Sequence, residues 1–547
     1  MRFADLHCHP HMRTYMWLSQ KRERLEKQGK FNPWTIISSN MSRMKRSKRA
    51  AGFSQCDFAM LWNSNVRLVF NSLYPIEREF FMGNKKTSKG NRQALKRVMR
   101  IATHHKLPIR SLLQGLVMRI PQRTINYIKS PKYKYWESLQ DEYKFLISKN
   151  QEDVTNELFT PSIRKLFENK ARRRNRFKNI LNANGSYWIP KNQKELKEAL
   201  DGKKDVITMI LTLEGAHALG TDHFEKTEDL IERVDYIKNE WDHPLFFITF
   251  AHHFDNKLCG HASSLPVFAK VLLNQDQFMN EGFSDMGKTV IRKLLSLDDN
   301  NETLEKDPYR ILIDIKHMSA RARKTYYEEI IDPCLEKGNI IPVIASHCGY
   351  SGKKTLQDLI DGLDLENDTD RIKTEDGTFY PWSINFCDED IKMIYKTGGL
   401  FGVEFDQRIL GVSANRKEEK VEMLNSIRGI WDNLKAVLNV ICNDPNLSSE
   451  DKKRAWDILG IGSDFDGYID PVTSYKTTLD WGKFTVDLLR IIKQDAGSEN
   501  PPACVQCFDS ELTPEVAVQK ICFGNAYNFV LKHYPNKVPV PLEAIIA

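Results

Sequence analysis

The chain has 547 residues, of which 41% are hydrophobic and 28% are charged, and its formal net charge is +8. This composition is ordinary for a globular protein with a large core, and it excludes a disordered chain, a collagen and a coiled coil. Because no apolar run approaches the ~18 residues that a membrane helix needs, we expect no membrane partner. The N-terminal segment MRFADLHCHPHM lacks the apolar stretch of a secretion signal, so we expect a cytoplasmic location.

Eight short apolar runs, most of them rich in β-branched or aromatic residues, alternate with helical patterns along the chain. Runs of this kind are typical of buried parallel strands. They cover residues 1–6, 56–70, 205–213, 245–251, 311–315, 340–345, 399–405 and 458–462. Helical patterns lie between them, for example at 283–297, 320–337 and 420–442. This alternation predicts an α/β protein whose strands close into a (β/α)8 TIM-type barrel.

A polar segment rich in Lys and Arg separates the second and third predicted strands. Its pattern is helical, as at 164–176, and it predicts a large helical insertion. We therefore expect residues 1–84 and 201–547 to form the barrel and residues 85–200 to form an inserted basic, mostly helical subdomain. Solvated helix faces explain this charge most simply, and a surface for an anionic partner is the alternative. Because few aromatic residues accompany the basic ones, we expect no nucleic-acid partner.

The ten cysteines are scattered along the chain and do not predict a disulfide scaffold. Cys504 and Cys507 form a CxxC pair without a second pair elsewhere in the sequence. Such an isolated pair is more typical of an incidental loop than of a metal or redox site.

Most of the predicted strands end in a histidine or a carboxylate. In a barrel the carboxyl ends of all strands meet at one mouth, where active sites are found. Residues hundreds of positions apart would therefore converge there. These residues are His7, His9, Glu214, His252, His317, His347 and Asp464.

Five of these side chains are predicted metal ligands. His7 and His9 are two positions apart, so on a strand both would face one cavity and chelate one ion. Glu214 ends an apolar run, where a carboxylate is costly unless a cation neutralises it, so we interpret it as a bridge between two metals. His317 and His347 follow successive strands and complete the set. Imidazole and carboxylate ligands suit zinc, iron or manganese.

Asp464 and His252 are the candidate catalytic residues. Asp464 follows the last predicted strand, where a carboxylate could shuttle the proton of a metal-bound water. His252 could instead donate a hydrogen bond to the oxyanion of a tetrahedral intermediate. We expect Asp466 to be a turn residue before Gly467. The remaining histidines are expected to be structural or surface residues: His11, His104, His105, His217, His223, His243, His253, His261 and His533.

The segments around these residues also carry a family resemblance. They are DLHCH at 5–9, LEG at 213–215, ITFAH at 248–252, GFSDMG at 282–287, DIKHMS at 314–319, ASH at 345–347 and GSDFDG at 462–467. In this order they resemble the D-G-H-x-D, E-G, L-T-x-T-H, G-L-[ST]-x-x-G, D-x-S-H-x-S, S-H and G-x-D-F-D-G motifs of the membrane (renal) dipeptidase family of zinc peptidases, in the amidohydrolase-type metallohydrolase superfamily. The last two segments are the most specific.

The resemblance implies a barrel that binds two divalent metal ions, usually zinc. It implies that His7 and His9 hold one ion, that His317 and His347 hold the other, and that Glu214 bridges them. It gives the two candidate catalytic residues the roles of proton shuttle and of substrate or oxyanion contact. Dimers are common in the family, so a homodimer is a further expectation.

Two departures from the family bear on the substrate. Position 9 is His where the family has Asp, which makes the first metal site more neutral. The arginine with which the family binds the substrate carboxylate aligns with Ile384, and an isoleucine cannot make that bidentate contact. We take the adjacent Asn385 as a substrate-binding candidate. Other sources of positive charge are Lys353, Lys354 and Arg408.

Together these features predict a dipeptidase-like, binuclear metal-dependent hydrolase that cleaves an amide or peptide bond of a small substrate through a metal-bridging hydroxide. One alternative keeps the metals and changes the substrate, as in a deacylase, a lactonase or another amidohydrolase. The other alternative is a catalytically silent barrel that acts as a binding scaffold and retains little metal.

Overall fold

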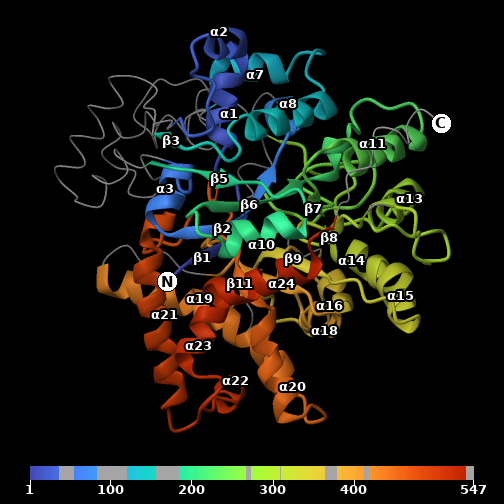
Figure 1. The fold of residues 1–547 in the computed structure, drawn as a ribbon. Helices are drawn as coiled ribbons and strands as arrows, with labels where there is room; N and C mark the ends of the chain where they lie inside the picture. The colour runs from blue at the N-terminus through green and yellow to red at the C-terminus, as the bar shows by residue number, and fades with distance from the viewer. Residues whose placement is uncertain are drawn as a thin grey trace, which may run out of the picture.

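A computed structural model describes residues 1–35, 54–82, 120–155, 184–265, 273–307, 309–363, 379–411, 419–467 and 469–536. In these segments eight strands follow one another in the order β1-β2-β6-β7-β8-β9-β10-β11, and each pairs in parallel with the next (Figure 1). The strands are β1 (Phe3–Cys8), β2 (Val66–Leu73), β6 (Ile207–Glu214), β7 (Leu245–Thr249), β8 (Leu312–Asp314), β9 (Ile344–Cys348), β10 (Leu400–Val403) and β11 (Leu459–Ile461).

The barrel closes through the segment that follows β11. The backbone N–H of Asp464 donates to the carbonyl of His7 at 2.9 Å, and the N–H of His9 donates to the carbonyl of Phe465 at 3.0 Å. Between them Cys8 and Phe465 form a parallel bridge. This closure fixes the end of β1 beside the loop after β11, at the mouth where parallel strands end.

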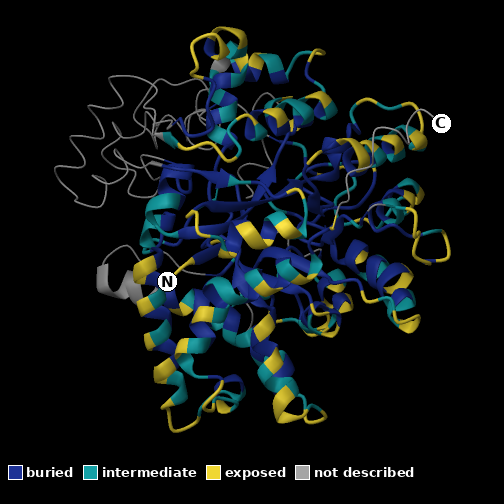
Figure 2. Ribbon diagram, viewed as in Figure 1, coloured by how far each residue is buried: buried dark blue, intermediate teal, exposed yellow. Residues whose placement is uncertain are grey.

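Helices surround the strands. Figure 2 shows the strands buried, whereas many helices expose one face. The helices are α1 (Met12–Leu18), η1 (Ser19–Lys21), α2 (Arg22–Glu26), α3 (Phe58–Asn63), α4 (Glu79–Met82), α7 (Gln122–Ile128), α8 (Tyr135–Ile147), α10 (Gln193–Asp201), η6 (Ala216–Leu219), α11 (Thr227–Glu240), α13 (Asp285–Leu294), α14 (Ala320–Tyr326), η7 (Tyr327–Ile331), α15 (Asp332–Glu336), α16 (Leu356–Asp361), α18 (Asp388–Thr397), α19 (Glu419–Cys442), α20 (Ser449–Arg454), η8 (Ala455–Ile458), η9 (Thr478–Asp480), α21 (Trp481–Ala496), α22 (Ala503–Gln506), α23 (Pro514–Gln519), η10 (Lys520–Gly524) and α24 (Asn525–His533). In the described segments, no helix combines the length and the apolar character needed to cross a membrane.

The prediction of a (β/α)8 barrel is confirmed, and each of the eight predicted runs overlaps a barrel strand. The run at 56–70 was wrong in its first half, because residues Phe58–Asn63 form α3 and only the end of the run enters β2. The carboxylate of Asp57 accepts a hydrogen bond from the N–H of Met60 at 3.0 Å, which caps this helix. An apolar run of that length fits a buried helix as well as a strand.

The described part of the region between β2 and β6 packs directly on the barrel. α8 contributes Leu139, Tyr143 and Leu146 to the main core. The ring of Tyr143 stacks on that of Trp241, with centroids 4.0 Å apart and an interplanar angle of 2°. Residues 83–119 and 156–183, with the predicted helix at 164–176, lie outside the described residues. The boundaries of the inserted subdomain therefore stay a prediction.

Short strands accompany α8. β3 (Val154–Thr155) and β4 (Asn184–Gly185) form an antiparallel pair, and β5 (Tyr187–Trp188) adds in parallel to the start of β6. The chain thus returns to the barrel before the third barrel strand begins.

A buried carboxylate ties α8 to the barrel mouth. Oε1 of Glu142 lies 2.6 Å from Nε2 of His11, and both of its oxygens accept from the backbone N–H of Tyr74 at 3.1 Å. Nδ1 of His11 lies 2.9 Å from Oδ1 of Asn71 on β2. This network joins α8 to the chain segments that follow β1 and β2.

Candidate metal centre

One buried carboxylate lies at the barrel mouth with imidazole rings around it. Glu214, the last residue of β6, is 3% exposed. The Nε2 atoms of five histidines face it, at 3.2 Å (His7), 3.4 Å (His252) and 3.8 Å (His317 and His347) from Oε1 and at 3.0 Å (His9) from Oε2. Oδ1 of Asp464 lies 3.9 Å from Nε2 of His7 and 3.8 Å from Nε2 of His9. The structure therefore brings together all seven residues that the sequence predicted to converge at the carboxyl ends of the strands.

Two overlapping groups of these side chains have a spacing that could hold a metal ion. One contains His7, Glu214, His347 and Asp464, and the other contains Glu214, His252 and His317. Within each group the ligand atoms lie within 4.8 Å of one another. Glu214 belongs to both groups, but the first group joins His7 to His347 rather than to His9, and the second joins His317 to His252.

Strand geometry and two backbone turns aim the side chains inward. His7 and His347 lie on β1 and β9, and their rings stack with centroids 3.9 Å apart. His317 and Asp464 lie three residues beyond β8 and β11, with left-handed φ angles of 66° and 53°. Such a conformation costs a residue with a side chain about 1–3 kcal/mol, and it persists where the surrounding structure enforces it.

Hydrogen bonds behind the rings orient two of the histidines. Nδ1 of His9 lies 3.1 Å from the carbonyl of Ser72, so this nitrogen carries the proton and leaves Nε2 as an acceptor. The hydroxyl of Ser346 donates to Oδ2 of Asp314 at 2.6 Å and lies 2.8 Å from Nδ1 of His347. The hydroxyl oxygen therefore accepts from His347, whose Nε2 also keeps its lone pair. Outer contacts of this kind are typical of metal-binding histidines.

Burial sets the protonation states of the candidate ligands. It lowers the pKa values of His7, His317 and His347, which favours neutral imidazoles. Burial opposes ionisation of Glu214, but the positive charge of His252, with those of His7 and His9 when they are protonated, outweighs it and holds the pKa of Glu214 well below its usual value. Neutral imidazoles and an ionised carboxylate are the forms that bind metal.

The pKa values of the two candidate catalytic residues are raised, whereas those of the candidate ligands above are lowered. Burial, together with the neighbouring carboxylates of Glu214 and Glu404, raises the pKa of Asp464 well above its usual value. Burial lowers the pKa of His252, but Glu77 and Glu214 outweigh this effect and raise it to about 10. A carboxylate with a raised pKa is a stronger proton acceptor than an ordinary one, which suits a residue that takes and returns a proton.

Glu77 is a site residue that the sequence did not reveal. Its Oε2 lies 2.6 Å from Nδ1 of His252 and accepts from the hydroxyl of Tyr74 at 3.0 Å. Its Oε1 accepts from the N–H of Phe254 at 3.1 Å. The one signal was its position soon after the second strand, because Glu77 lies in a proline-containing segment without strand or helix periodicity.

A buried ion pair beside the centre also escaped prediction. Nζ of Lys316 lies 2.9 Å from Oε2 of Glu404, and both side chains are almost fully buried. Lys316 precedes His317, and Glu404 follows β10. The pair places one more positive and one more negative charge near Asp464, whose pKa both groups influence.

His253, which we expected to be structural, lies beside the five histidines that surround Glu214, which we call the histidine cluster. Its ring centroid is 4.0 Å from that of His252 and 5.1 Å from that of His317. Its Nδ1 is 2.6 Å from the hydroxyl of Ser264. His253 therefore lines the mouth next to the candidate ligands.

The side chain of Asn385 hydrogen-bonds to the backbone of neighbouring segments. Its Nδ2 donates to the carbonyls of Tyr380 at 3.1 Å and Ile409 at 3.0 Å, and the residue is fully buried. Among the described contacts, none joins its side chain to the histidine cluster. Its role in substrate binding stays a prediction.

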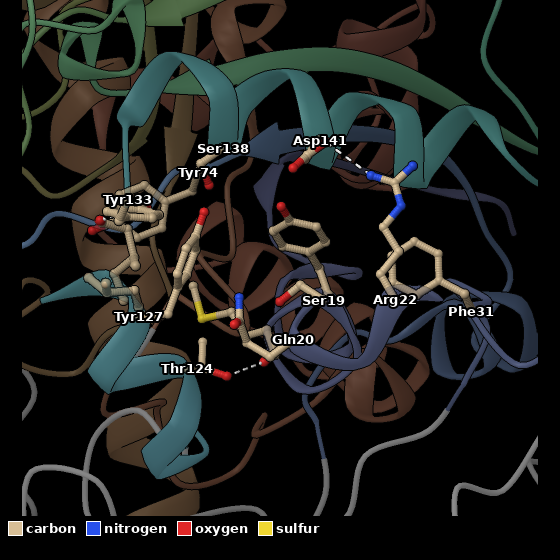
Figure 3. A pocket seen from close by; sticks show the side chains of 14 residues that line it. Ser19, Gln20, Arg22, Phe31, Tyr74, Thr124, Tyr127, Tyr133, Ser138 and Asp141 are labelled. Carbon is tan, nitrogen blue, oxygen red and sulfur yellow. Dashed lines mark hydrogen bonds and ion pairs between the residues drawn. The ribbon is translucent and has the colours of Figure 1, made fainter. Parts of the chain in front are cut away.

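A pocket lies between α1, η1, α7 and α8 (Figure 3), with about 570 Å³ of space that is partly open to solvent. Its walls include the rings of Tyr127 and Tyr133. To the right of the pocket in Figure 3, Nη1 of Arg22 donates a hydrogen bond to Oδ1 of Asp141 at 3.0 Å. Residues from the insertion, on α7 and α8, thus form part of this pocket.

Tyr74 is the link between this pocket and the histidine cluster. It lines the pocket, and its ring centroid lies 4.9 Å from that of His252 and 6.0 Å from that of His9. The pocket is therefore beside the cluster, with one aromatic ring between them.

Neither a family model nor a curated protein matches the chain. Among solved structures, the chain is similar to dipeptidase AC, a metallopeptidase of family M19, with 13% identity, a TM-score of 0.46 and coverage of 98% of this chain and 99% of that one. It is similar to a metallopeptidase from Rhodobacter sphaeroides liganded with a phosphinate mimic of the dipeptide L-Ala-D-Ala, with 13% identity, a TM-score of 0.44 and coverage of 97% and 99%.

A third similar structure is the probable dipeptidase PvdM from Pseudomonas aeruginosa, with 13% identity, a TM-score of 0.39 and coverage of 94% of this chain and 97% of that one. At TM-scores below 0.5 these likenesses assign no activity to this chain. Its function has to be inferred from its own side chains.

Proposed function

We propose that the chain is a binuclear metal-dependent hydrolase that cleaves an amide or peptide bond of a small substrate, in the manner of a dipeptidase. The observation that carries this proposal is the convergence of five imidazole nitrogens on the buried carboxylate of Glu214. Within the described residues, Nε2 of His7 and Nε2 of His9 are buried and make no hydrogen bond. Both atoms face the carboxylate of Glu214, at 3.2 and 3.0 Å, and an unprotonated nitrogen beside a buried carboxylate is costly unless a cation lies between them. Divalent metal ions would provide that cation.

In this proposal His7 and His9 would hold one ion, His317 and His347 would hold the other, and Glu214 would contribute to both sites. Zinc is the expected metal, because neutral imidazoles and a carboxylate are among its common ligands. When bound, the ions supply an acidified water and polarise the scissile carbonyl.

Two residues perform the remaining chemistry. Asp464 takes a proton from the attacking water and passes it to the leaving amine. His252 donates a hydrogen bond to the carbonyl oxygen as negative charge develops there. Glu77 holds the other nitrogen of His252 at 2.6 Å and so fixes the direction of that ring.

A deacylase or lactonase activity is a second candidate, favoured by the surroundings of position 384. Ile384 is 2% exposed and offers no charge. Nε of Arg408 lies 2.9 Å from both carboxylate oxygens of Asp406, so its charge is already balanced. A substrate without a free carboxylate would need no cation at this place.

The test combines metal analysis with a substrate panel. Purified full-length protein loaded with zinc is analysed by plasma mass spectrometry and assayed with dipeptides, N-acyl amino acids and lactones. We expect close to two zinc equivalents and hydrolysis of at least one amide class. The matched control is Glu214→Gln, which keeps the shape of the side chain and should lose metal and activity together. A wild-type protein that folds but retains no metal would instead support the silent scaffold. The cytoplasmic location, the homodimer and the lack of a nucleic-acid partner stay predictions.

A further inference from the structure

The buried carboxylate of Asp314 joins three neighbouring barrel strands. Asp314 is the last residue of β8 and is fully buried. Its Oδ1 accepts from the backbone N–H of Lys316 at 3.1 Å and from that of Ser346 on β9 at 3.0 Å. Its Oδ2 accepts from the hydroxyls of Ser346 and of Thr249, the last residue of β7, each at 2.6 Å. Four hydrogen bonds therefore hold this carboxylate in one orientation.

The hydroxyl of Ser346 lies between this carboxylate and two of the proposed metal ligands. Its oxygen is 2.8 Å from Nδ1 of His347 and 3.5 Å from Nδ1 of His7. The rings of these two histidines stack on each other, with centroids 3.9 Å apart. Among the described contacts, neither Nδ1 atom has another hydrogen-bond partner. One serine oxygen thus serves two imidazole rings.

The single hydrogen of this hydroxyl decides the direction of the contacts. A hydroxyl has one hydrogen to donate and two lone pairs that accept, whereas a carboxylate only accepts. Asp314 therefore takes the hydrogen of Ser346, and the serine oxygen is left to accept an N–H from each ring. Both rings then carry their hydrogen on Nδ1. Their Nε2 atoms, which face Glu214, keep the lone pair that a metal ion needs.

We propose that Asp314 is a positioning residue, which acts through the hydrogen of Ser346 to hold both His7 and His347 in the tautomer that binds metal. The inference rests on the proposed function for the role of these histidines as ligands. The tautomers themselves are properties of the chain and exist without an ion. Among the described residues, no hydrogen bond joins Asp314 directly to either ring, so its influence passes through the serine.

Replacing Asp314 with Asn should reverse this chain of hydrogen bonds. We expect the amide oxygen to take the place of Oδ1, where two backbone N–H groups donate, so that the amide nitrogen faces the hydroxyls of Thr249 and Ser346. The oxygen of Ser346 would then accept from the amide, and its hydrogen would turn to the Nδ1 atom of a histidine. That histidine would carry its own hydrogen on Nε2 and could not bind metal there.

The test measures tautomers and zinc affinity in full-length protein. Solid-state NMR of metal-free protein with ¹⁵N-labelled histidine shows which ring nitrogen carries the hydrogen, and the variants His7→Gln and His347→Gln assign the signals. We expect Nδ1–H on both rings of the wild type and Nε2–H on His347, which is closer to the serine, in Asp314→Asn. Competition with a chelator should show zinc affinity lowered by about 10–100-fold in Asp314→Asn and in Ser346→Ala.

Two controls separate this role from a structural one. Thr249→Val removes the other hydroxyl on Oδ2, which has no described contact with a histidine, and it should keep wild-type zinc affinity. Asp57→Asn makes the same chemical change at another buried carboxylate, which accepts from the hydroxyl of Ser54. It should lower the thermal midpoint and keep both the tautomers and the zinc affinity of the wild type.

Three results would overturn the proposal. The first is Nε2–H on His347 in the wild type, a result that needs no substitution and therefore stands even if a variant fails to fold. The second is an unchanged tautomer in Asp314→Asn, and the third is a loss of zinc affinity in Thr249→Val as large as that in Ser346→Ala. A wild-type protein that binds no zinc would contradict the proposed hydrolase instead, and the spectra of metal-free protein would still decide the role of Asp314.

Discussion

The carboxylate of Glu77 and the imidazole of His252 are joined at 2.6 Å, between segments that follow two different barrel strands. Glu77 also accepts hydrogen bonds from the hydroxyl of Tyr74 and from the N–H of Phe254, so both of its oxygens are engaged. The opposite nitrogen of His252 lies 3.4 Å from Glu214. A chain of polar contacts therefore runs from the wall of the mouth to the proposed bridging carboxylate.

Replacing Glu77 with Gln should lower kcat by about 10–100-fold, a range typical of residues that orient a histidine at a metal centre. The amide keeps the size of the side chain, but it removes the negative charge that helps to raise the pKa of His252. Metal content should stay near that of the wild type, because Glu77 is not a proposed ligand. Steady-state kinetics and metal analysis on the same preparation measure both quantities.

Glu79→Gln is the matched control for this variant. Glu79 is a nearby but exposed carboxylate, and its Oε2 accepts from the hydroxyl of Tyr135 at 3.0 Å. This control should keep wild-type kcat. Equal activity of the two variants would show that the charge of Glu77 does not act through His252.

Replacing Asp464 with Asn should reduce kcat by about 10²–10⁴-fold while both metal ions are retained. An amide cannot accept and return the proton of the attacking water, although it fills the same space. The measurement is kcat at saturating substrate, together with metal content. Near-full turnover of Asp464→Asn would remove Asp464 from the mechanism.

Asp466→Asn provides a contrast two positions along the chain. Oδ2 of Asp466 accepts from the N–H groups of Gln55 at 2.9 Å and Cys56 at 3.1 Å, and Oδ1 lies 2.8 Å from Nε of Arg13. This carboxylate is thus a structural anchor, beyond the turn role that we expected from the sequence. Its variant should lower the thermal midpoint more than Asp464→Asn does, while its kcat per folded molecule changes less.

The barrel could be predicted because its strands are buried on both faces, which requires continuous apolar runs. The prediction failed at 56–70, where α3 and β2 are both buried and the run shows no clear periodicity. The two elements meet around Asn65, which has a left-handed φ of 61°. In sequence this residue resembles any other polar interruption.

The convergence of the histidines could also be predicted, since every candidate ligand lies on a strand or within a few residues of its end. Glu77 could not, because its partner His252 is far away in the sequence and no periodic pattern marks the segment that holds Glu77. Asn385 was inferred from a family alignment, which carries no information about the contacts of this particular side chain.

Replacing Glu142 with Ala should lower the free energy of unfolding by about 3–5 kcal/mol, as expected when one partner of a buried charged contact is removed. The change leaves Nε2 of His11 and the N–H of Tyr74 without their acceptor. Glu137→Ala, at an exposed position on the same helix, is the control and should change stability by less than about 0.5 kcal/mol. Chemical denaturation followed by tryptophan fluorescence measures both variants. If they unfold alike, α8 is held to the barrel by its apolar face alone.

Removal of metal should abolish hydrolysis and lower the thermal midpoint, because a ligand that binds only the folded state stabilises it. Five imidazoles and two carboxylates would then face one another without a cation at the mouth. Dialysis against a chelator, followed by differential scanning calorimetry with and without added zinc, measures the loss and its recovery. The variant Glu214→Gln should show a low midpoint from the start and no response to zinc. A wild-type midpoint that ignores both chelator and zinc would mean that hydrogen bonds alone hold the histidines together, and the hydrolase proposal would lose its basis.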